Sequence, residues 1–93
     1  MIRSFGSKDT ERLWRRARVP SIDPRILSAA LRKLRQVGSA ESLDDLRLPP
    51  GNRLEALKGD RAGQHSIRIN DQWRVCFVWT DAGPEEVEIV DYH

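Results

Sequence analysis

The sequence predicts an α+β fold in which two helices from the N-terminal half pack on one face of a mainly antiparallel sheet of four to five strands. Two observations predict this class. Apolar residues recur at helical spacing up to residue 37, whereas from residue 53 onward they lie in short segments that turn residues separate. The implied order, β-α-α-β-β-β-β, is typical of helices on one face of a sheet. Because 93 residues are too few for two cores, one domain over residues 1–93 is expected.

The first predicted elements are a short edge strand from Ile2 to Phe5 and a helix from about Lys8 to Ala17. Ser7 is a good N-cap for that helix, and Val19-Pro20 would end the helical pattern. The apolar side of this helix would carry Leu13, Trp14 and Ala17.

The second helix has clearer boundaries. Asp23 is expected to be its N-cap, with Pro24 at the first helical position and Gly38 just past the end. Its apolar stripe is formed by six residues at helical spacing: Ile26, Leu27, Ala30, Leu31, Leu34 and Val37.

The second half of the chain is expected to form a loop over residues 39–52 and then four strands. The strands are predicted at residues 53–58, 65–69, 72–79 and 85–92, and Asn70-Asp71 should make a tight two-residue hairpin connection. Residues 72–79 are apolar on both faces apart from Arg74, so this strand should be central, and the Arg74 guanidinium should need a partner.

Charge is distributed unevenly along the chain. Residues 1–37 carry ten Lys and Arg against three Asp and Glu, a net of +7, whereas residues 38–93 have a net of −5. A basic half either attracts polyanions or forms a solvated helical face, and charge alone leaves both interpretations open.

Composition argues against secreted, membrane and metal-dependent proteins. No apolar run approaches the roughly 20 residues of a membrane helix, and the N-terminus lacks a signal-peptide block. The lone Cys76 should be buried, as in a reducing cytoplasm. The two His and one Cys lack the spacing of a zinc site, and the segment 59–63 lacks phosphate-loop spacing. We therefore expect a cytoplasmic protein with no cofactor and no membrane partner.

The remaining polar residues suit metal-independent RNA cleavage. In that reaction the 2′-hydroxyl attacks the adjacent phosphate, so the protein must move two protons and stabilise negative charge on the phosphate. Arg and Lys serve the charge, whereas His or Tyr serve proton transfer or base stacking. The strand half and the C-terminus offer such groups: Arg53, Lys58, Arg61, Arg68, Arg74, Asp91, Tyr92 and His93.

Three segments carry a resemblance to a known family. They are Leu57-Lys58-Gly59-Asp60, Trp73-Arg74-Val75-Cys76-Phe77 and the terminal Asp91-Tyr92-His93. Together with the surrounding sequence they resemble the plasmid-maintenance killer proteins of the HigB type, within the RelE/ParE toxin superfamily. The resemblance covers essentially the whole chain, although the two helices match only in pattern.

The resemblance implies a RelE-like fold and the toxin of a type II toxin–antitoxin system. It implies an endoribonuclease (an mRNA interferase) that cuts mRNA in the ribosomal A site, in contact with 16S rRNA, and so inhibits translation. It also implies a cognate helix-turn-helix antitoxin of the HigA type, with operator DNA bound only through that antitoxin during operon co-repression.

The resemblance also implies roles for individual residues. It places the family's functional lysine at Lys58, its strand arginine at Arg74 and its terminal group at Asp91, Tyr92 and His93. Within that group we expect His93 to be the general acid or base, because an imidazole can serve either role near neutral pH. Glu55 stands where some relatives carry a catalytic histidine, and is either a base or a charge that repels phosphate. Three further arginines are expected to hold the substrate backbone, namely Arg53, Arg61 and Arg68. The helix arginines Arg12, Arg15 and Arg16 are expected either to dock on ribosomal RNA or to meet an acidic surface of the antitoxin. We expect His65 to be a packed histidine.

Two other functions are compatible with the same sequence. ParE-type relatives share the fold but poison DNA gyrase, and a shared fold does not determine chemistry. A non-catalytic regulator that binds RNA or an antitoxin through its basic face is the other alternative, which Glu55 keeps open.

Overall fold

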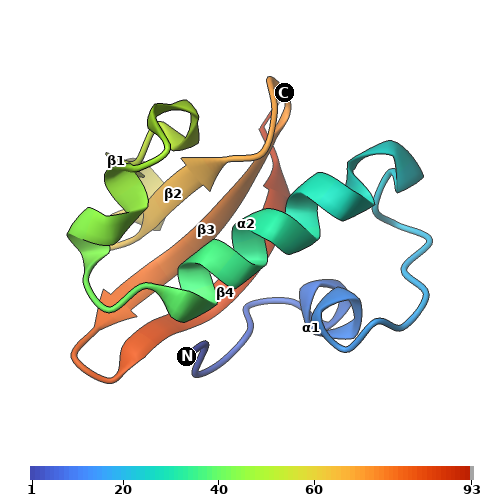
Figure 1. Cartoon of the computed structure of the whole chain (residues 1–93), viewed down its shortest axis with the longest axis horizontal. Helices are drawn as coiled ribbons and strands as arrows, with labels where there is room; N and C mark the ends of the chain where they lie inside the picture. The colour runs from blue at the N-terminus through green and yellow to red at the C-terminus, as the bar shows by residue number, and fades with distance from the viewer. Residues whose placement is uncertain (93) are drawn as a thin grey trace.

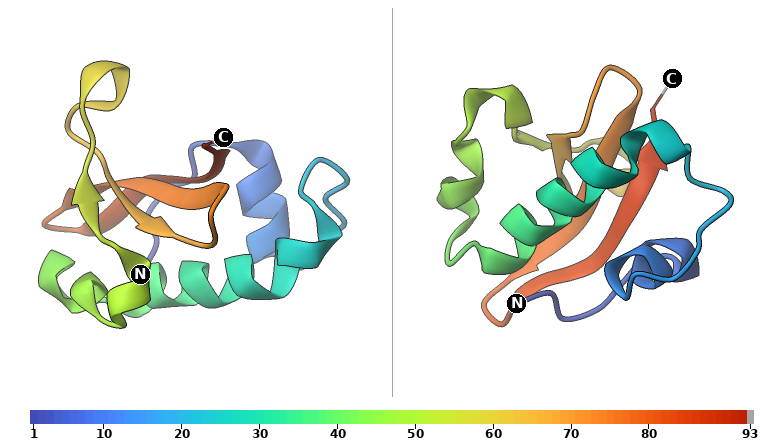
Figure 2. Two further views of the ribbon diagram at one scale, coloured as in Figure 1. Left: turned by 90° about the horizontal axis from the view of Figure 1, so that it is seen from above. Right: turned by 45° about the vertical axis from the view of Figure 1, so that its right-hand side comes forward.

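The computed structural model describes residues 1–92, which form two α-helices and a four-stranded antiparallel sheet in the order β1-β2-β3-β4 (Figure 1). The predicted fold class is therefore confirmed. The helices are α1 (Lys8–Trp14) and α2 (Leu27–Ser39), and the strands are β1 (Glu55–Ala56), β2 (His65–Arg68), β3 (Trp73–Thr80) and β4 (Gly83–Asp91). Helix α2 crosses one face of the sheet and α1 lies beside β4 (Figure 2). Neither helix within residues 1–92 is long and apolar enough to cross a membrane.

The hydrophobic core lies between α2 and the sheet. The stripe predicted for α2 supplies Ala30, Leu34 and Val37, and the sheet supplies Ile67, Val75, Phe77 and Val87, all without exposed surface. Burying each of the larger of these side chains stabilises the fold by about 1.5–3 kcal/mol. Because neighbouring residues of a strand point to opposite faces, Arg74 and Cys76 lie on the face of β3 that α2 does not cover.

The predicted N-terminal strand is wrong in extent, because it shrinks to a single parallel bridge between Phe5 and Val87. Three backbone hydrogen bonds still tie the segment to β4, with Arg3 N donating to Pro84 O at 2.8 Å. A regular ladder cannot form, since Pro84 has no N–H and the N–H of Glu86, whose φ is +52°, donates to Ser4 Oγ instead.

Helix α1 is shorter than predicted. It ends at Trp14 rather than Ala17 because Arg16 adopts the left-handed conformation, with φ of +65°, and Ala17 N donates to Arg12 O at 2.8 Å. Ala17 is consequently exposed instead of lying on the apolar side. This turn redirects the chain so that Val19 and Ile22 reach the core.

Helix α2 begins after a 3₁₀ turn over Pro24–Ile26, for which Asp23 is the N-cap as predicted. The predicted end is wrong, because the helix continues through Gly38 to Ser39. An added Cβ at Gly38 would lie 3.4 Å from Ile2 Cγ1 and 3.5 Å from Trp14 Cη2. These are ordinary van der Waals distances, so Gly38 lies where α2 packs against Ile2 and Trp14 and does not mark the helix end.

Two connections differ from the predictions. The segment 39–52 is not a plain loop, because it contains 3₁₀ helices at Leu43–Arg47 and Pro50–Asn52. The β2–β3 turn is longer than two residues, since Ile69 N donates to Trp73 O at 2.9 Å and leaves residues 70–72 between them. The side-chain oxygen of Asn70 accepts hydrogen bonds from Gln72 N and Trp73 N, which stabilises this three-residue turn.

Candidate functional site

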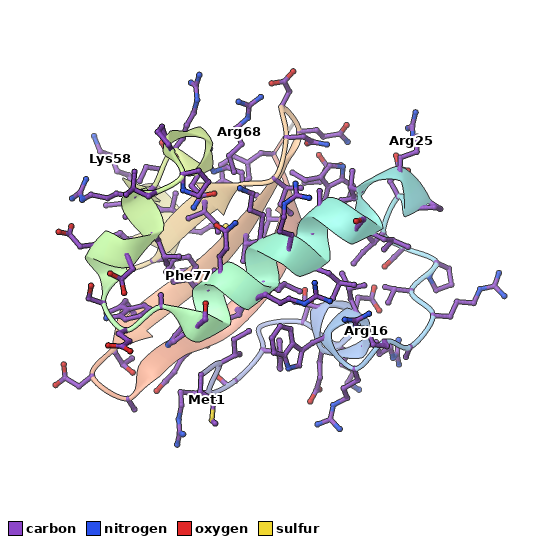
Figure 3. The ribbon with its side chains drawn as sticks, in the orientation of Figure 1. Met1, Arg16, Arg25, Lys58, Arg68 and Phe77 are labelled. Carbon is purple, nitrogen blue, oxygen red and sulfur yellow. The ribbon has the colours of Figure 1, made fainter. Side chains whose placement is uncertain are left out.

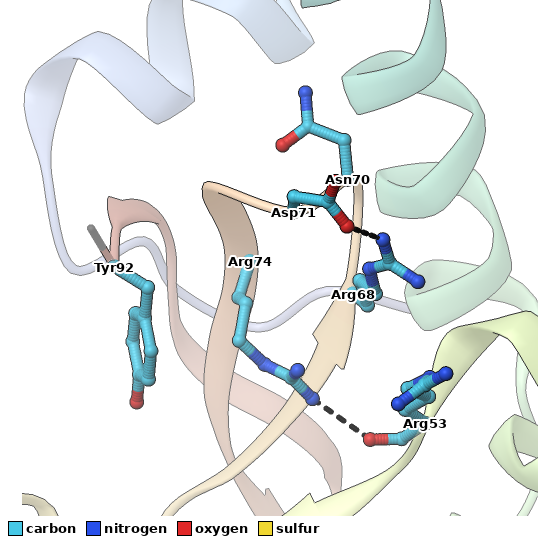
Figure 4. Close-up of a pocket in the computed structure, with 6 residues that line it drawn as sticks. All are labelled: Arg53, Arg68, Asn70, Asp71, Arg74 and Tyr92. Atoms are coloured by element: carbon cyan, nitrogen blue, oxygen red, sulfur yellow. Dashed lines mark hydrogen bonds and ion pairs between the residues drawn. The ribbon is translucent and has the colours of Figure 1, made fainter.

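An open cavity of about 380 Å³ lies on the sheet face that α2 leaves uncovered (Figure 4). Strands β2 and β3 and the ends of the neighbouring segments supply its lining: Arg53, Arg68, Asn70, Asp71, Arg74 and Tyr92. Four of the residues proposed from the sequence therefore meet here, namely Arg53, Arg68, Arg74 and Tyr92. Three guanidinium groups around one cavity make it attractive to anions.

Arg74 is the most firmly held of these cations. Its side chain is only 12% exposed. Its Nε donates to Ser66 Oγ at 2.7 Å, and its Nη2 donates to the Arg53 carbonyl at 2.7 Å. The predicted need for a partner is confirmed. Because these bonds occupy Nε and Nη2, the guanidinium is fixed in orientation while Nη1 has no hydrogen-bond partner among residues 1–92.

Arg68 lies directly opposite Arg74 across the β2–β3 ladder. Like charges in such a position destabilise a sheet unless an anion lies between them or near them. Asp71, in the β2–β3 turn, forms an ion pair with Arg68 (Figure 4). The Asp71 side chain is otherwise 97% exposed, so a phosphate can compete for Arg68 at little cost.

Glu55 approaches the cavity from β1. Its carboxylate Oε1 lies 3.6 Å from Arg74 Nη2, and its side chain is 53% exposed. Strand β1 brings it there because Glu55 pairs with Ser66, which in turn pairs with Cys76 of β3. Glu55 is therefore an ion-pair partner of Arg74. The sequence left two roles open for Glu55, a base or a charge that repels phosphate.

Tyr92 forms the aromatic wall of the cavity. The Arg74 Cζ atom lies 5.9 Å from the centre of its ring, within cation–π distance. Partial burial raises the pKa of Tyr92, and the neighbouring Cys76 thiol raises it further, whereas Arg61 and Arg74 lower it. The phenol is thus neutral at neutral pH and able to donate a hydrogen bond, while 42% of the residue stays exposed to a ligand.

Arg61 and Glu88 form a second ion pair on the sheet. Arg61 Nη1 donates to Glu88 Oε1 at 2.9 Å, which raises the pKa of Arg61. Cys76, opposite Glu88 in the β3–β4 ladder, is fully buried as predicted, and burial raises the pKa of its thiol. Arg61 is therefore near the cavity without lining it, and its charge is already matched by a carboxylate.

The other proposed residues lie at different places. Lys58 is exposed, and its side chain forms no hydrogen bond or ion pair with the described part of the chain; it projects at the same end of the molecule as Arg68 (Figure 3). Asp91 accepts a hydrogen bond from Gln72 Nε2 at 3.0 Å, at the outer end of β4. His93 lies outside the described residues, so its proposed role stays a prediction.

The three helix arginines are not part of the cavity. Arg12 pairs with Asp9 and Arg15 pairs with Glu11 on the exposed side of α1, and Arg16 follows the helix end. Figure 3 shows Arg16 on the α1 side of the molecule, away from Lys58 and Arg68. Arg12, Arg15 and Arg16 therefore lie on or directly after α1, apart from the cavity.

Sequence reasoning missed several residues of the site. Ser66 and Asn70 were not singled out, although alternation places Ser66 on the same face as Arg68. Lys33, a charged residue of α2, is only 8% exposed, and its ammonium group donates a hydrogen bond to Asn52 Oδ1. His65 is half-buried with its ring stacked on Phe77, as a packed histidine would be.

No group of three potential metal ligands occurs among residues 1–92.

Comparison with known proteins gives a family for this chain. Residues 3–93 match the family described as HigB-like toxin, RelE-like toxin of type II toxin-antitoxin system HigB. Toxin HigB-1 of Vibrio cholerae is 48% identical over 56 residues, which are 60% of this chain and 59% of that protein. The matched segment thus spans less than two thirds of that relative. Endoribonuclease HigB of Proteus vulgaris is 26% identical over the whole length of both chains.

A solved structure agrees with the fold. It is described as a YoeB/ParE toxin from Agrobacterium tumefaciens, and it aligns with a TM-score of 0.53 over 99% of this chain and 96% of its own. At 22% identity this likeness supports the architecture alone.

Proposed function

This chain belongs to the HigB-like family of RelE-like toxins from type II toxin–antitoxin systems, and on that premise we propose that it is an endoribonuclease that cleaves mRNA without a metal ion. Family membership also implies an antitoxin partner. The observation that carries the proposal is the cavity that Arg53, Arg68 and Arg74 line together with the exposed ring of Tyr92. Cations converge there, where a metal-dependent nuclease would need carboxylates.

Arg74 and Lys58 are proposed to stabilise the negative charge that develops on the phosphate. As the 2′-hydroxyl attacks, negative charge grows on the non-bridging phosphate oxygens, and a fixed guanidinium stabilises it without having to reorganise. Arg74 offers Nη1 for this, because Nε and Nη2 are held by Ser66 and Arg53. Lys58 adds a mobile cation at the same end of the molecule.

Proton transfer is assigned to the C-terminal group. His93 is proposed as the general acid or base, since an imidazole serves either role near neutral pH. Tyr92 is proposed to stack on an unpaired base and to donate a hydrogen bond to the phosphate from its neutral phenol. Arg53, Arg61 and Arg68 hold the RNA backbone.

The cellular setting proposed is the ribosomal A site. Arg12, Arg15 and Arg16 would contact 16S rRNA, and the toxin would act in the cytoplasm. The antitoxin is proposed to be of the HigA type, with operator DNA bound through it alone.

The deciding experiment is primer extension on cellular mRNA after induction of this chain, compared with induction of Arg74→Ala. We expect defined mRNA ends with the unaltered chain and none with the variant. Induced DNA damage without mRNA ends would favour gyrase poisoning, and growth arrest or antitoxin binding without either would favour a non-catalytic regulator.

A further inference from the structure

Lys33 is a charged residue inside the fold. It lies on α2, faces the segment 43–52 and donates a hydrogen bond to the side-chain oxygen of Asn52. Burial lowers the pKa of Lys33, and the neighbouring charge of Arg32 lowers it further. Holding an ammonium group in such a place is unfavourable unless the interactions it makes fix a required geometry.

Asn52 is the centre of a buried network. It has no exposed surface, and its Nδ2 donates to Gln36 Oε1 at 2.9 Å, to Leu46 O at 3.2 Å and to Leu48 O at 3.3 Å. The Asn52 network, meaning Lys33, Gln36, Asn52 and these two carbonyl groups, therefore joins α2 to the segment 43–52. A network in which the donors and acceptors are paired rigidifies the backbone it contacts.

The backbone that follows Asn52 reaches the cavity. Arg53 adopts the left-handed conformation with φ of +46°, which is costly for a residue with a side chain and persists only where its surroundings impose it. In this conformation the Arg53 carbonyl accepts the hydrogen bond from Arg74 Nη2 at 2.7 Å (Figure 4). A continuous chain of contacts thus runs from Lys33 through Asn52 and the Arg53 carbonyl to the Arg74 guanidinium.

We propose that Lys33 and Asn52 are positioning residues for Arg74, a role that rests on the proposed cleavage of RNA at the same cavity. The Arg53 carbonyl holds Nη2 on one side, and the Glu55 carboxylate lies 3.6 Å from the same nitrogen. When the network is broken, Arg53 leaves its strained conformation and its carbonyl withdraws. The guanidinium then turns towards Glu55, and Nη1 no longer points at the phosphate.

The test uses Lys33→Met and Asn52→Asp in the full chain, with Thr10→Val as the matched control. Lys33→Met keeps the length of the side chain but removes the donor, and Asn52→Asp keeps the acceptor for Lys33 but removes the donors to Leu46 and Leu48. Thr10 is also buried, and its hydroxyl accepts a hydrogen bond from Ile89 N at 2.9 Å, at the β4 edge of the sheet. Its loss costs a comparable hydrogen bond without touching the network.

The expected kinetic result is a fall in kcat on a defined mRNA of about 10- to 100-fold for both network variants, since small displacements of a catalytic group have effects of this order. KM should change by less than about threefold, because Arg74 acts mainly on charge that develops during the reaction. Thr10→Val should lower the melting temperature and leave kcat unchanged. Equal kcat values for the network variants and the unaltered chain, or a loss seen only in KM, would overturn the proposal.

A second measurement follows Arg74 itself and does not depend on cleavage. The Nε–Hε NMR signal of Arg74 is recorded in each folded variant, and inorganic phosphate is titrated against it. We expect the network variants to shift this signal and to bind phosphate slightly more weakly than Thr10→Val does, in keeping with the small change expected in KM. An unchanged signal in folded network variants would refute the positioning role even if RNA is cleaved. If the network variants shift the Arg74 signal but the unaltered chain cleaves no RNA, the proposed function is refuted and the positioning role is kept.

Discussion

Glu55 offers the sharpest test of how the cavity works, because its two possible roles have opposite outcomes. The substitution Glu55→Gln removes one negative charge from a position 3.6 Å from Arg74 Nη2 and keeps the shape of the side chain. If Glu55 is a partner that competes with RNA for Arg74, the variant should cleave faster. If Glu55 is a general base, it should cleave more slowly.

The structure sets the magnitude of the first effect. Two unit charges at this separation interact by about 4–5 kcal/mol at an effective dielectric constant of 20. Solvent screens this pair strongly because Glu55 is 53% exposed, so its contribution falls to about 1 kcal/mol or less. Removing it should therefore raise kcat/KM by up to about fivefold. Arg74 keeps its orientation meanwhile, since Ser66 and the Arg53 carbonyl still hold it.

The assay is cleavage of a defined mRNA by purified protein at low and at high salt, with Glu41→Gln as the control. Glu41 is an exposed carboxylate that follows α2 and does not line the cavity, so its removal should have little effect. The gain from Glu55→Gln should shrink at 1 M salt, where charges are screened over about 3 Å. A loss of about 100-fold or more would refute this reasoning and identify Glu55 as the base.

Three further outcomes are expected from the same site. Arg74→Lys keeps the charge but cannot reproduce the bonds to Ser66 and Arg53, so kcat in the mRNA assay should fall by about 100-fold, as when a fixed oxyanion donor is removed; retention of full activity would exclude an oriented guanidinium. Tyr92→Phe should keep most of the RNA affinity measured by fluorescence anisotropy, whereas Tyr92→Ala should lose about 1–3 kcal/mol of stacking, and equal losses would assign the effect to the hydroxyl. Burial raises the pKa of the Cys76 thiol above its unfolded value, so folding favours the protonated form. That contribution is fully present below the unfolded pKa and is lost as the pH rises above about 8.5; the alkaline decline in urea-unfolding free energy should therefore be shallower in Cys76→Ala, and an unchanged slope would contradict the assignment.

Much of the architecture was predictable because it follows from periodicity. The α2 stripe and the apolar strand around Val75 and Phe77 set the helix-on-sheet arrangement, and the isolated Arg74 pointed to a paired cation on the open face. The errors arose where a tertiary contact overrides a local signal. Gly38 resembled a helix end, but α2 continues to Ser39, and Ile2 and Trp14 pack against it there.

The site was predictable in its residue types and less so in its supports. Cations on alternating strand positions, such as Arg68 and Arg74, are visible in the sequence once the strands are assigned. The roles of Asn52 and Lys33 were not predictable from the sequence, because a Lys that becomes buried has the same place in an amphipathic helix pattern as an exposed one. Only the path of the segment 43–52 shows that Lys33 faces a buried amide.

The way the N-terminal segment covers β4 also limits how an antitoxin can bind. Many partners attach to a sheet by β-augmentation, adding a strand to an exposed edge. Here the β4 edge is already occupied by the bonds from Arg3 and Gly6 and by the Thr10 hydroxyl, and the opposite edge is β1, which is two residues long. Among residues 1–92 the sheet thus presents little free edge, so we expect a protein partner to contact side chains on the faces of the sheet instead of extending its hydrogen-bond ladder.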